Sequence, residues 1–139
     1  MKVVLDTNVI ISGLLWKGIP GEVLEKCLKE HTICFSEDTL SELETALSYP
    51  KFIPHLEKLT FSLEDFLTRL TERALIISKP IQEISVIKEH PSDNKFLVCA
   101  ISCQASFIIS GDKHLLKLKE FQGIPIVTPK KFLKIIKKK

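Results

Sequence analysis

The sequence predicts an α/β protein built on a parallel sheet with helices covering both faces. Segments with strand-like and helix-like patterns alternate along the whole chain. The strand-like segments are continuous apolar runs, and such runs are typical of strands that are buried on both faces. The chain has 139 residues, which is the length of one ordinary domain. We therefore expect a single domain over residues 1–139.

Five short apolar runs rich in β-branched residues are expected to form the strands. The first of them ends at Asp6, and the fourth is followed by Gly111 and Asp112. Apolar runs of this length, bounded by polar or turn-forming residues, are typical of buried strands. The five predicted strands are Lys2–Leu5, Thr32–Phe35, Leu75–Ser78, Phe107–Ser110 and Ile124–Val127.

The segments between these strands carry apolar residues at the spacing of amphipathic helices. Ser36, followed by Glu37 and Asp38, is suited to cap one helix, and Ser62 is suited to cap another. Residues 18–21 are interpreted as a break, and residues 80–91 as a connector without an assigned structure. The predicted helices are Glu22–Glu30, a helix after Ser36 that ends near Tyr49, Lys51–Lys58 with an interruption at Pro54, Leu63–Ala74, Asp93–Ala105, a turn at Leu115–Leu118 and a final helix from Pro129.

The composition excludes several classes of protein. Apolar residues make up 45% and charged residues 27% of the chain, as in folded globular proteins rather than disordered ones. The longest uncharged stretch, Phe96–Gly111, is too short and too polar for a membrane span, and the N-terminus does not read as a signal peptide. We therefore expect a cytoplasmic protein without membrane attachment.

The four cysteines, Cys27, Cys34, Cys99 and Cys103, form no CxxC pair, so we interpret them as small core residues in a reducing compartment. Cys99 and Cys103 lie one helical turn apart, which leaves a soft-metal site as the alternative. The four histidines show no zinc-binding spacing.

Charge is distributed unevenly along the chain. Residues 1–111 carry 11 basic and 15 acidic side chains, a balance of −4, whereas residues 112–139 carry nine lysines against two acids, a balance of +7. Such a basic end is suited to contact nucleic-acid phosphates. The alternative is a solvated helix face whose lysines lie favourably at a helix C-terminus.

Acidic residues stand where chemistry is expected in a parallel α/β sheet, just outside the carboxyl ends of the strands. Asp6 ends the first strand, Asp112 follows the fourth, and Asp93 starts the helix that leads into the fourth. The helix after the second strand offers Glu42 or Glu44, between which a helical wheel does not decide, because they flank the apolar stripe on opposite edges.

A cluster of carboxylates repels itself and calls for a cation. Two unit charges about 4 Å apart repel by about 4 kcal/mol at an effective dielectric near 20. Oxygen ligands alone favour a hard divalent ion, Mg²⁺ or Mn²⁺, and such a site activates water and stabilises an in-line phosphoryl displacement. Each acid also has a simpler explanation, as a helix cap, a turn residue or a surface residue. Asp6 is the hardest to explain in this way, because burying an unpaired acid is costly.

In these motifs the whole chain resembles the PIN domain family, in the branch of toxins from toxin–antitoxin pairs (VapC-like ribonucleases). The resemblance rests on Leu5-Asp6-Thr7-Asn8, Glu42-Leu43 with Leu47, Asp93-Asn94-Lys95-Phe96-Leu97, Ser110-Gly111-Asp112-Lys113 and the closing segment Ile126–Leu133. It implies a three-layer α/β/α sandwich with a five-stranded parallel sheet in the order 3-2-1-4-5. It also implies a Mg²⁺- or Mn²⁺-dependent ribonuclease acting on single-stranded RNA, with an antitoxin protein as a partner and a homodimer as the assembly.

The resemblance also assigns roles to individual residues. Asp6, Asp93 and Asp112 are expected to ligate the metal, and the helix acid is Glu42, as a ligand or in support of the ligands. Asn8 and Ser110 are expected to orient the carboxylates by hydrogen bonds. Lys113 and the C-terminal lysines, among them Lys137 and Lys138, are expected to hold RNA phosphates.

Two positions depart from the pattern of the branch, which usually carries acids where this chain has His90 and Val98. These departures favour one alternative, a PIN-fold RNA- or protein-binding module with impaired catalysis. A second alternative is a haloacid-dehalogenase-like phosphatase with Asp6 as nucleophile. That chemistry needs an acid two residues further on, where this chain has Asn8.

Overall fold

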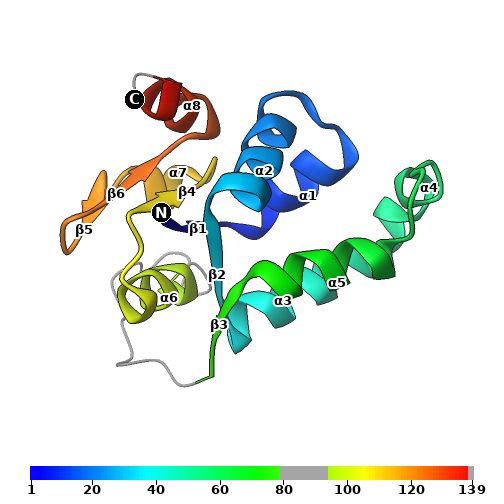
Figure 1. The fold of residues 1–139 in the computed structure, drawn as a ribbon, viewed down its shortest axis with the longest axis horizontal. Helices are drawn as coiled ribbons and strands as arrows, with labels where there is room; N and C mark the ends of the chain where they lie inside the picture. The colour runs from blue at the N-terminus through cyan, green and yellow to red at the C-terminus, as the bar shows by residue number, and fades with distance from the viewer. Residues whose placement is uncertain (79–93, 138–139) are drawn as a thin grey trace.

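A computed structural model of the chain describes residues 1–78 and 94–137. Its centre is a sheet of six strands in the order β3-β2-β1-β4-β6-β5 (Figure 1). All neighbouring strands are parallel except β5 and β6, which are antiparallel. The strands are β1 (Lys2–Leu5), β2 (Thr32–Ser36), β3 (Leu75–Ile77), β4 (Phe107–Ile109), β5 (Glu120–Phe121) and β6 (Ile124–Val127).

Helices connect the strands and cover both faces of the sheet. They are α1 (Thr7–Leu15), α2 (Gly18–Glu30), α3 (Glu37–Leu47), η1 (Pro50–Phe52), α4 (Ile53–Leu56), α5 (Leu63–Arg73), α6 (Asn94–Cys103), α7 (Lys113–Leu116) and α8 (Pro129–Lys137). The predicted caps are present: Ser36 accepts a hydrogen bond from the Thr39 backbone, and Ser62 accepts one from the Asp65 backbone. None of these helices is long and apolar enough to cross a bilayer.

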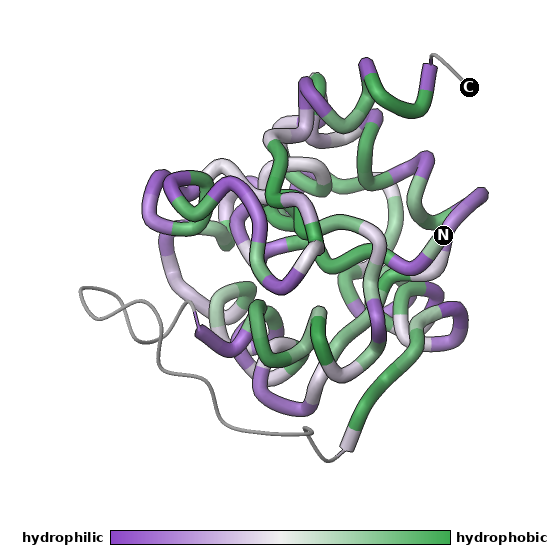
Figure 2. The backbone as a smooth tube through the Cα atoms, turned by 90° about the vertical axis from the view of Figure 1, so that its left-hand side faces the viewer, coloured by the Kyte–Doolittle hydropathy of each residue, from purple (hydrophilic) through white to green (hydrophobic). Residues whose placement is uncertain are grey.

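The core lies in two layers separated by the sheet. Val3 and Leu5 pack on one side with α1, α2, α3, α5 and α8, whereas Val4 packs on the other side with α6 and α7. Successive residues of a strand point to opposite faces, and all three of these side chains are at most 2% exposed. Burial on both faces explains why the strands are continuous apolar runs. In Figure 2 the last helix, α8, alternates between hydrophilic and hydrophobic residues, as expected of a helix that covers a core on one side only.

The predicted fold class and strand order are confirmed, and the sheet has one strand more than predicted. The additional strand, β5, has two residues and pairs with β6 through a tight turn in which Gln122 and Gly123 have positive φ angles of 47° and 83°. This left-handed backbone is typical of short hairpin turns. Two residues are too short a segment for a period-two pattern to appear in the sequence.

The prediction of a break at residues 18–21 was wrong, because these residues form the first turn of α2. The segment before them, which had no assigned structure, forms α1. Gly13 of α1 allows the two helices to approach closely: a Cβ there would lie 2.7 Å from the carbonyl oxygen of Pro20. Pro20 is tolerated because the first N–H groups of a helix have no partner within the helix.

Candidate functional site

Asp6 is a buried carboxylate at the carboxyl end of the central strand β1. Its side chain is also the N-cap of α1, because Oδ1 accepts a hydrogen bond of 2.9 Å from the backbone N–H of Val9. The residue is only 4% exposed. Burial raises the pKa of Asp6 above its usual value, hydrogen bonds from Ser110 and Val9 oppose the rise, and the charge of Asp112 adds to it. The carboxylate therefore has a free-energy cost that a bound cation would lower.

Ser110 joins Asp6 to Asp112. It follows β4, the neighbour of β1, and is fully buried. Its hydroxyl donates to Oδ2 of Asp6 and accepts a hydrogen bond of 2.9 Å from the backbone N–H of Asp112. Asp112 in turn caps α7, because its Oδ1 accepts a hydrogen bond of 2.7 Å from the N–H of His114. These bonds hold two aspartates at the carboxyl ends of adjacent strands.

Glu42 on α3 lies beside the start of α1. Its Oε2 accepts a hydrogen bond from the hydroxyl of Thr7, and its Oε1 accepts one of 3.1 Å from Nζ of Lys95. The side chains of Glu42 and Lys95 are 30% and 26% exposed. Glu44, the other helix acid, is exposed and makes no such contact. The contacts of Glu42 therefore distinguish the two glutamates, which the helical wheel did not.

Thr7 and Lys95 were not predicted to have a role in the site, yet both touch Glu42. For Lys95 a signal was present in the sequence. It lies in the first turn of α6, where the helix dipole makes a cation unfavourable by about 0.3–1 kcal/mol. A residue that contradicts a local preference often serves the tertiary structure or a site.

The remaining predicted residues are placed as follows. Asp93 and Lys138 lie outside the described residues. Asn8 is exposed in the first turn of α1, and Lys113 is exposed beside Asp112. Lys137 is not brought to this site: it forms an ion pair of 3.8 Å with Glu22.

The end of α8 that carries Lys137 lies at the opposite edge of the sheet. Together with Met1 and His31, Lys137 lines a shallow cavity of about 350 Å³ at the starts of β1 and β2. The amino end of a strand and its carboxyl end are on opposite edges, so this cavity and Asp6 are separated by the length of β1.

The acidic side chains at this edge of the sheet are of the kind that binds a hard divalent cation, but those among the described residues do not complete a site. Asp6 and Asp112 supply carboxylate oxygens, the ligands that Mg²⁺ and Mn²⁺ prefer. Within residues 1–78 and 94–137, no group of three or more histidine, cysteine, aspartate or glutamate side chains is arranged to hold a metal ion. The four cysteines are buried, as predicted for core residues, and burial raises the pKa of the Cys27 thiol to about 12.

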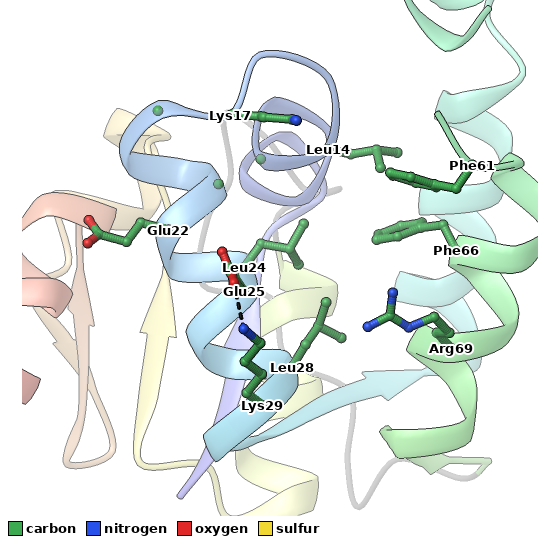
Figure 3. Close-up of a pocket in the computed structure, with 13 residues that line it drawn as sticks. Leu14, Lys17, Glu22, Leu24, Glu25, Leu28, Lys29, Phe61, Phe66 and Arg69 are labelled. Carbon is green, nitrogen blue, oxygen red and sulfur yellow. Dashed lines mark hydrogen bonds and ion pairs between the residues drawn. The ribbon is translucent and has the colours of Figure 1, made fainter. Parts of the chain in front are cut away.

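A groove separates α1 and α2 from α5 (Figure 3). It has a volume of about 610 Å³, and Leu14, Leu28 and Phe66 point into it from its two sides. Arg69 lies at one end, while Glu25 and Lys29 form an ion pair of 2.7 Å on the rim. An apolar floor with a charged rim is the pattern of a surface that receives an amphipathic segment.

Comparison with known proteins relates most of the chain to one family. Residues 2–114 match a family model described as "PIN domain". An uncharacterized protein of Methanocaldococcus jannaschii is 32% identical over 148 residues, which span 99% of this chain and 93% of that protein.

Two solved structures share the fold. They are VapBC2 from Rickettsia felis bound to a DNA fragment from their promoter and FitAcB from Neisseria gonorrhoeae. For the first, the TM-score is 0.60 with 20% identity, covering 92% of this chain and 98% of that one. For the second, the TM-score is 0.55 with 19% identity, covering 91% and 97%.

Proposed function

The chain belongs to the PIN domain family, and from this premise we propose that it is a Mg²⁺- or Mn²⁺-dependent endoribonuclease that cleaves single-stranded RNA. The observation that carries the proposal is the buried Asp6 carboxylate, linked through Ser110 to Asp112 at the carboxyl edge of the sheet. A buried acid with a raised pKa in this position is typical of functional sites.

In the proposed mechanism, Asp6, Asp93 and Asp112 would hold the cation. The bound cation would lower the pKa of a water molecule and stabilise the charge on the phosphodiester during in-line attack. The products would be a 5′-phosphate and a 3′-hydroxyl. Ser110 keeps Asp6 in one orientation by donating to it, and the cap to Val9 holds the other oxygen. Such supporting hydrogen bonds preorganise metal ligands.

Glu42 supports the ligands rather than binding the cation directly. Each of its carboxylate oxygens already has a donor within the protein, Thr7 on one side and Lys95 on the other. Unlike the oxygens of Asp6, one of them is paired with a cation, so a metal ion bound directly to Glu42 would lie close to the Lys95 ammonium and be repelled by it. Lys95 also neutralises the charge of Glu42, which lowers the repulsion that four acids would otherwise produce.

We further propose that the chain is the toxin of a toxin–antitoxin pair and acts in the cytoplasm as a homodimer. The groove between α2 and α5 is suited to an apolar segment of the antitoxin, with Arg69 available for an acidic side chain of that partner. Co-expression with any small open reading frame that adjoins the gene, followed by co-purification of the wild-type chain and of Leu28→Asp, tests this partner. Loss of co-purification in the variant is the expected result. Equal recovery of the partner protein with the wild-type chain and with the variant would mean that the antitoxin does not bind in this groove.

The activity test uses labelled single-stranded RNA of mixed sequence with EDTA, Mg²⁺ or Mn²⁺. Cleavage is expected only with a metal ion, and Asp6→Asn and Glu42→Gln should each lose it. Glu44→Gln is the matched control, because Glu44 is on the same helix but exposed. RNA binding without cleavage in the wild-type chain would favour the impaired binding module, and hydrolysis of a phosphomonoester would favour the phosphatase alternative.

A further inference from the structure

Exposed aromatic rings and basic side chains meet where the loop after α1 touches the segment between α3 and α5. We name this surface the aromatic platform. It consists of Trp16, Lys17, Tyr49, Lys51, Phe52 and His55.

The rings of the platform contact one another in series. The Trp16 ring lies 5.0 Å from His55 and 6.1 Å from Phe52, and Tyr49 is stacked on Phe52 at 6.5 Å with an interplanar angle of 15°. Phe52 is buried and anchors the series, whereas Trp16 and Tyr49 are 55% and 46% exposed. Contiguous exposed apolar surface marks interaction sites, and Trp and Tyr are enriched at interfaces because one end of the ring system is apolar and the other polar.

Cations surround these rings. Nζ of Lys51 lies 5.1 Å from the centre of the Phe52 ring. Lys17, His55 and Lys58 line a small cavity of about 150 Å³ together with Phe61. Glu57 is the acid that lies closest in the sequence to these lysines. Positive charge interleaved with exposed rings is the pattern of surfaces that bind single-stranded nucleic acid by stacking and phosphate contacts.

The platform and the carboxylate site share two helices. Thr7 begins α1 and Trp16 follows its end, while Glu42 lies midway along α3 and Tyr49 follows its end. At 1.5 Å per residue, Glu42 and Tyr49 are about 10 Å apart along α3, and Thr7 and Trp16 are about 14 Å apart along α1. At about 3.4 Å per nucleotide of a stacked strand, these distances correspond to about three or four nucleotides.

We propose that the aromatic platform stacks the bases of single-stranded RNA a few nucleotides from the bond that is cleaved. The proposal rests on the proposed nuclease function, because the carboxylate site supplies the bond in question. Trp16 and Tyr49 present the stacking faces, and Lys17 and Lys51 contact the adjoining phosphates. Stacking of this kind tolerates any base, so the platform adds affinity rather than sequence specificity.

A second copy of the chain is a poorer occupant of the same surface. A two-fold interface brings each patch against its own counterpart. Such an interface would collect the two lysines of each platform, and no residue of the platform is an acid that could pair with them. The charge of the platform is complementary to a polyanion instead.

The test uses Trp16 itself, since it is the single tryptophan of the chain. In full-length protein carrying Asp6→Asn to prevent cleavage, a titration with polyuridylate is expected to quench the tryptophan fluorescence in a saturable way. Anisotropy of a labelled uridine oligomer should give the same affinity. On that background Trp16→Ala should weaken RNA binding about five- to 150-fold, the range measured for removal of one stacking ring, and Trp16→Phe should retain most of the affinity. Lys51→Met should reduce the slope of log affinity against log salt by about 0.7.

Ile76→Ala and Lys26→Met are the matched controls, since they remove an exposed apolar side chain and an exposed lysine far from the platform. Unchanged fluorescence on RNA binding, or equal RNA affinity in Trp16→Ala, would overturn the proposal while leaving the nuclease function intact. RNA binding with quenching but without cleavage in the wild-type chain would instead overturn the nuclease and retain the platform. A change of oligomeric state in Trp16→Ala at equal RNA affinity would identify the surface as a contact between copies, against the proposal.

Discussion

Replacing Asp6 with asparagine or with alanine separates its two roles, as a helix cap and as a buried charge. Asparagine caps a helix about as well as aspartate does. Its Oδ1 can keep the bond to the N–H of Val9, and its amide nitrogen can donate to the hydroxyl of Ser110, which also accepts from Asp112. Alanine can do neither. Both variants should lack nuclease activity, but we expect their stabilities to differ.

The structure gives the size of that difference. Loss of the cap costs about 1 kcal/mol. The buried Ser110 hydroxyl loses its acceptor in both variants, so that cost does not separate them. Alanine also lacks the bond to Ser110 that asparagine can form, and one hydrogen bond contributes about 0.5–1.5 kcal/mol. Asp6→Ala should therefore unfold with a free energy about 1.5–2.5 kcal/mol below that of Asp6→Asn. With a slope of about 2 kcal/mol per molar urea, the midpoints would differ by about 1 M.

The pH dependence of the same pair tests the buried charge. Burial raises the pKa of Asp6 in the folded state, so during a rise in pH the unfolded chain loses this proton first. The contribution of Asp6 to the free energy of unfolding is therefore fully present at a pH below the ordinary pKa of about 3.9. It is lost as the pH rises through the folded-state pKa. Asp6→Asn has no such loss. Without metal, its free energy of unfolding should therefore rise relative to that of the wild-type chain as the pH is raised from about 3.5 to 7.

The assay is urea unfolding followed by circular dichroism in EDTA, with Asp65→Asn and Asp65→Ala as controls in an exposed first turn. These controls should differ by no more than about 0.5 kcal/mol. Equal stabilities of the two Asp6 variants would refute the cap and the Ser110 bond. An asparagine variant that is clearly less stable than the wild-type chain at pH 7 would refute the claim that the buried charge of Asp6 lowers the free energy of unfolding.

Three further predictions concern the neighbours of this carboxylate. Thr7→Val should lower cleavage more than Thr7→Ser does, because only serine keeps a hydroxyl for Glu42; equal loss in single-turnover cleavage would speak against the bond. Lys95→Met should tighten Mn²⁺ binding, measured by titration calorimetry, because it removes a cation beside the site; weaker binding would show that Lys95 is needed to orient Glu42. Removal of Lys137 with the two residues after it should reduce the salt slope of RNA affinity by about 0.7 per lost contact, and identical slopes would mean that this end is only solvated.

The strands were predictable from the sequence because burial on both faces leaves an unambiguous apolar run. All five predicted strands occur, within one residue at each end. Capped helices were equally clear, since Ser36 and Ser62 carry their signal locally. By contrast, no structure was predicted for α1, whose first half is rich in the β-branched residues Thr7, Val9, Ile10 and Ile11. Its start is capped by Asp6, and after its end at Leu15 the chain turns into α2 at Lys17 and Gly18, whose φ angles are 58° and 61°.

The candidate site could be predicted in part for the same reason. Residues that directly follow a strand are placed by the strand, so Asp6 and Asp112 were identifiable from their positions alone. Glu42 lies midway along a helix, and the rotation of that helix about its axis decides which residue faces the site. The contacts with Thr7 and Lys95 that show this rotation are tertiary contacts, which the sequence does not reveal.

The charge of the chain illustrates the difference between a pattern in sequence and a surface in space. The basic C-terminal stretch was predicted to contact RNA because its lysines are concentrated in the sequence, yet Lys137 lies at the edge of the sheet opposite to Asp6. The lysines of the aromatic platform lie in two segments whose surroundings in the sequence are nearly neutral, and they meet only because α1 and α3 run side by side from adjacent strands. An extended RNA strand that starts at Asp6 can follow these two helices without crossing the sheet. If both groups of lysines bind RNA, the two must therefore contribute to affinity independently. The change in salt slope caused by truncating the C-terminal lysines should then add to the change caused by substituting the platform lysines, because sites so far apart share no contacts.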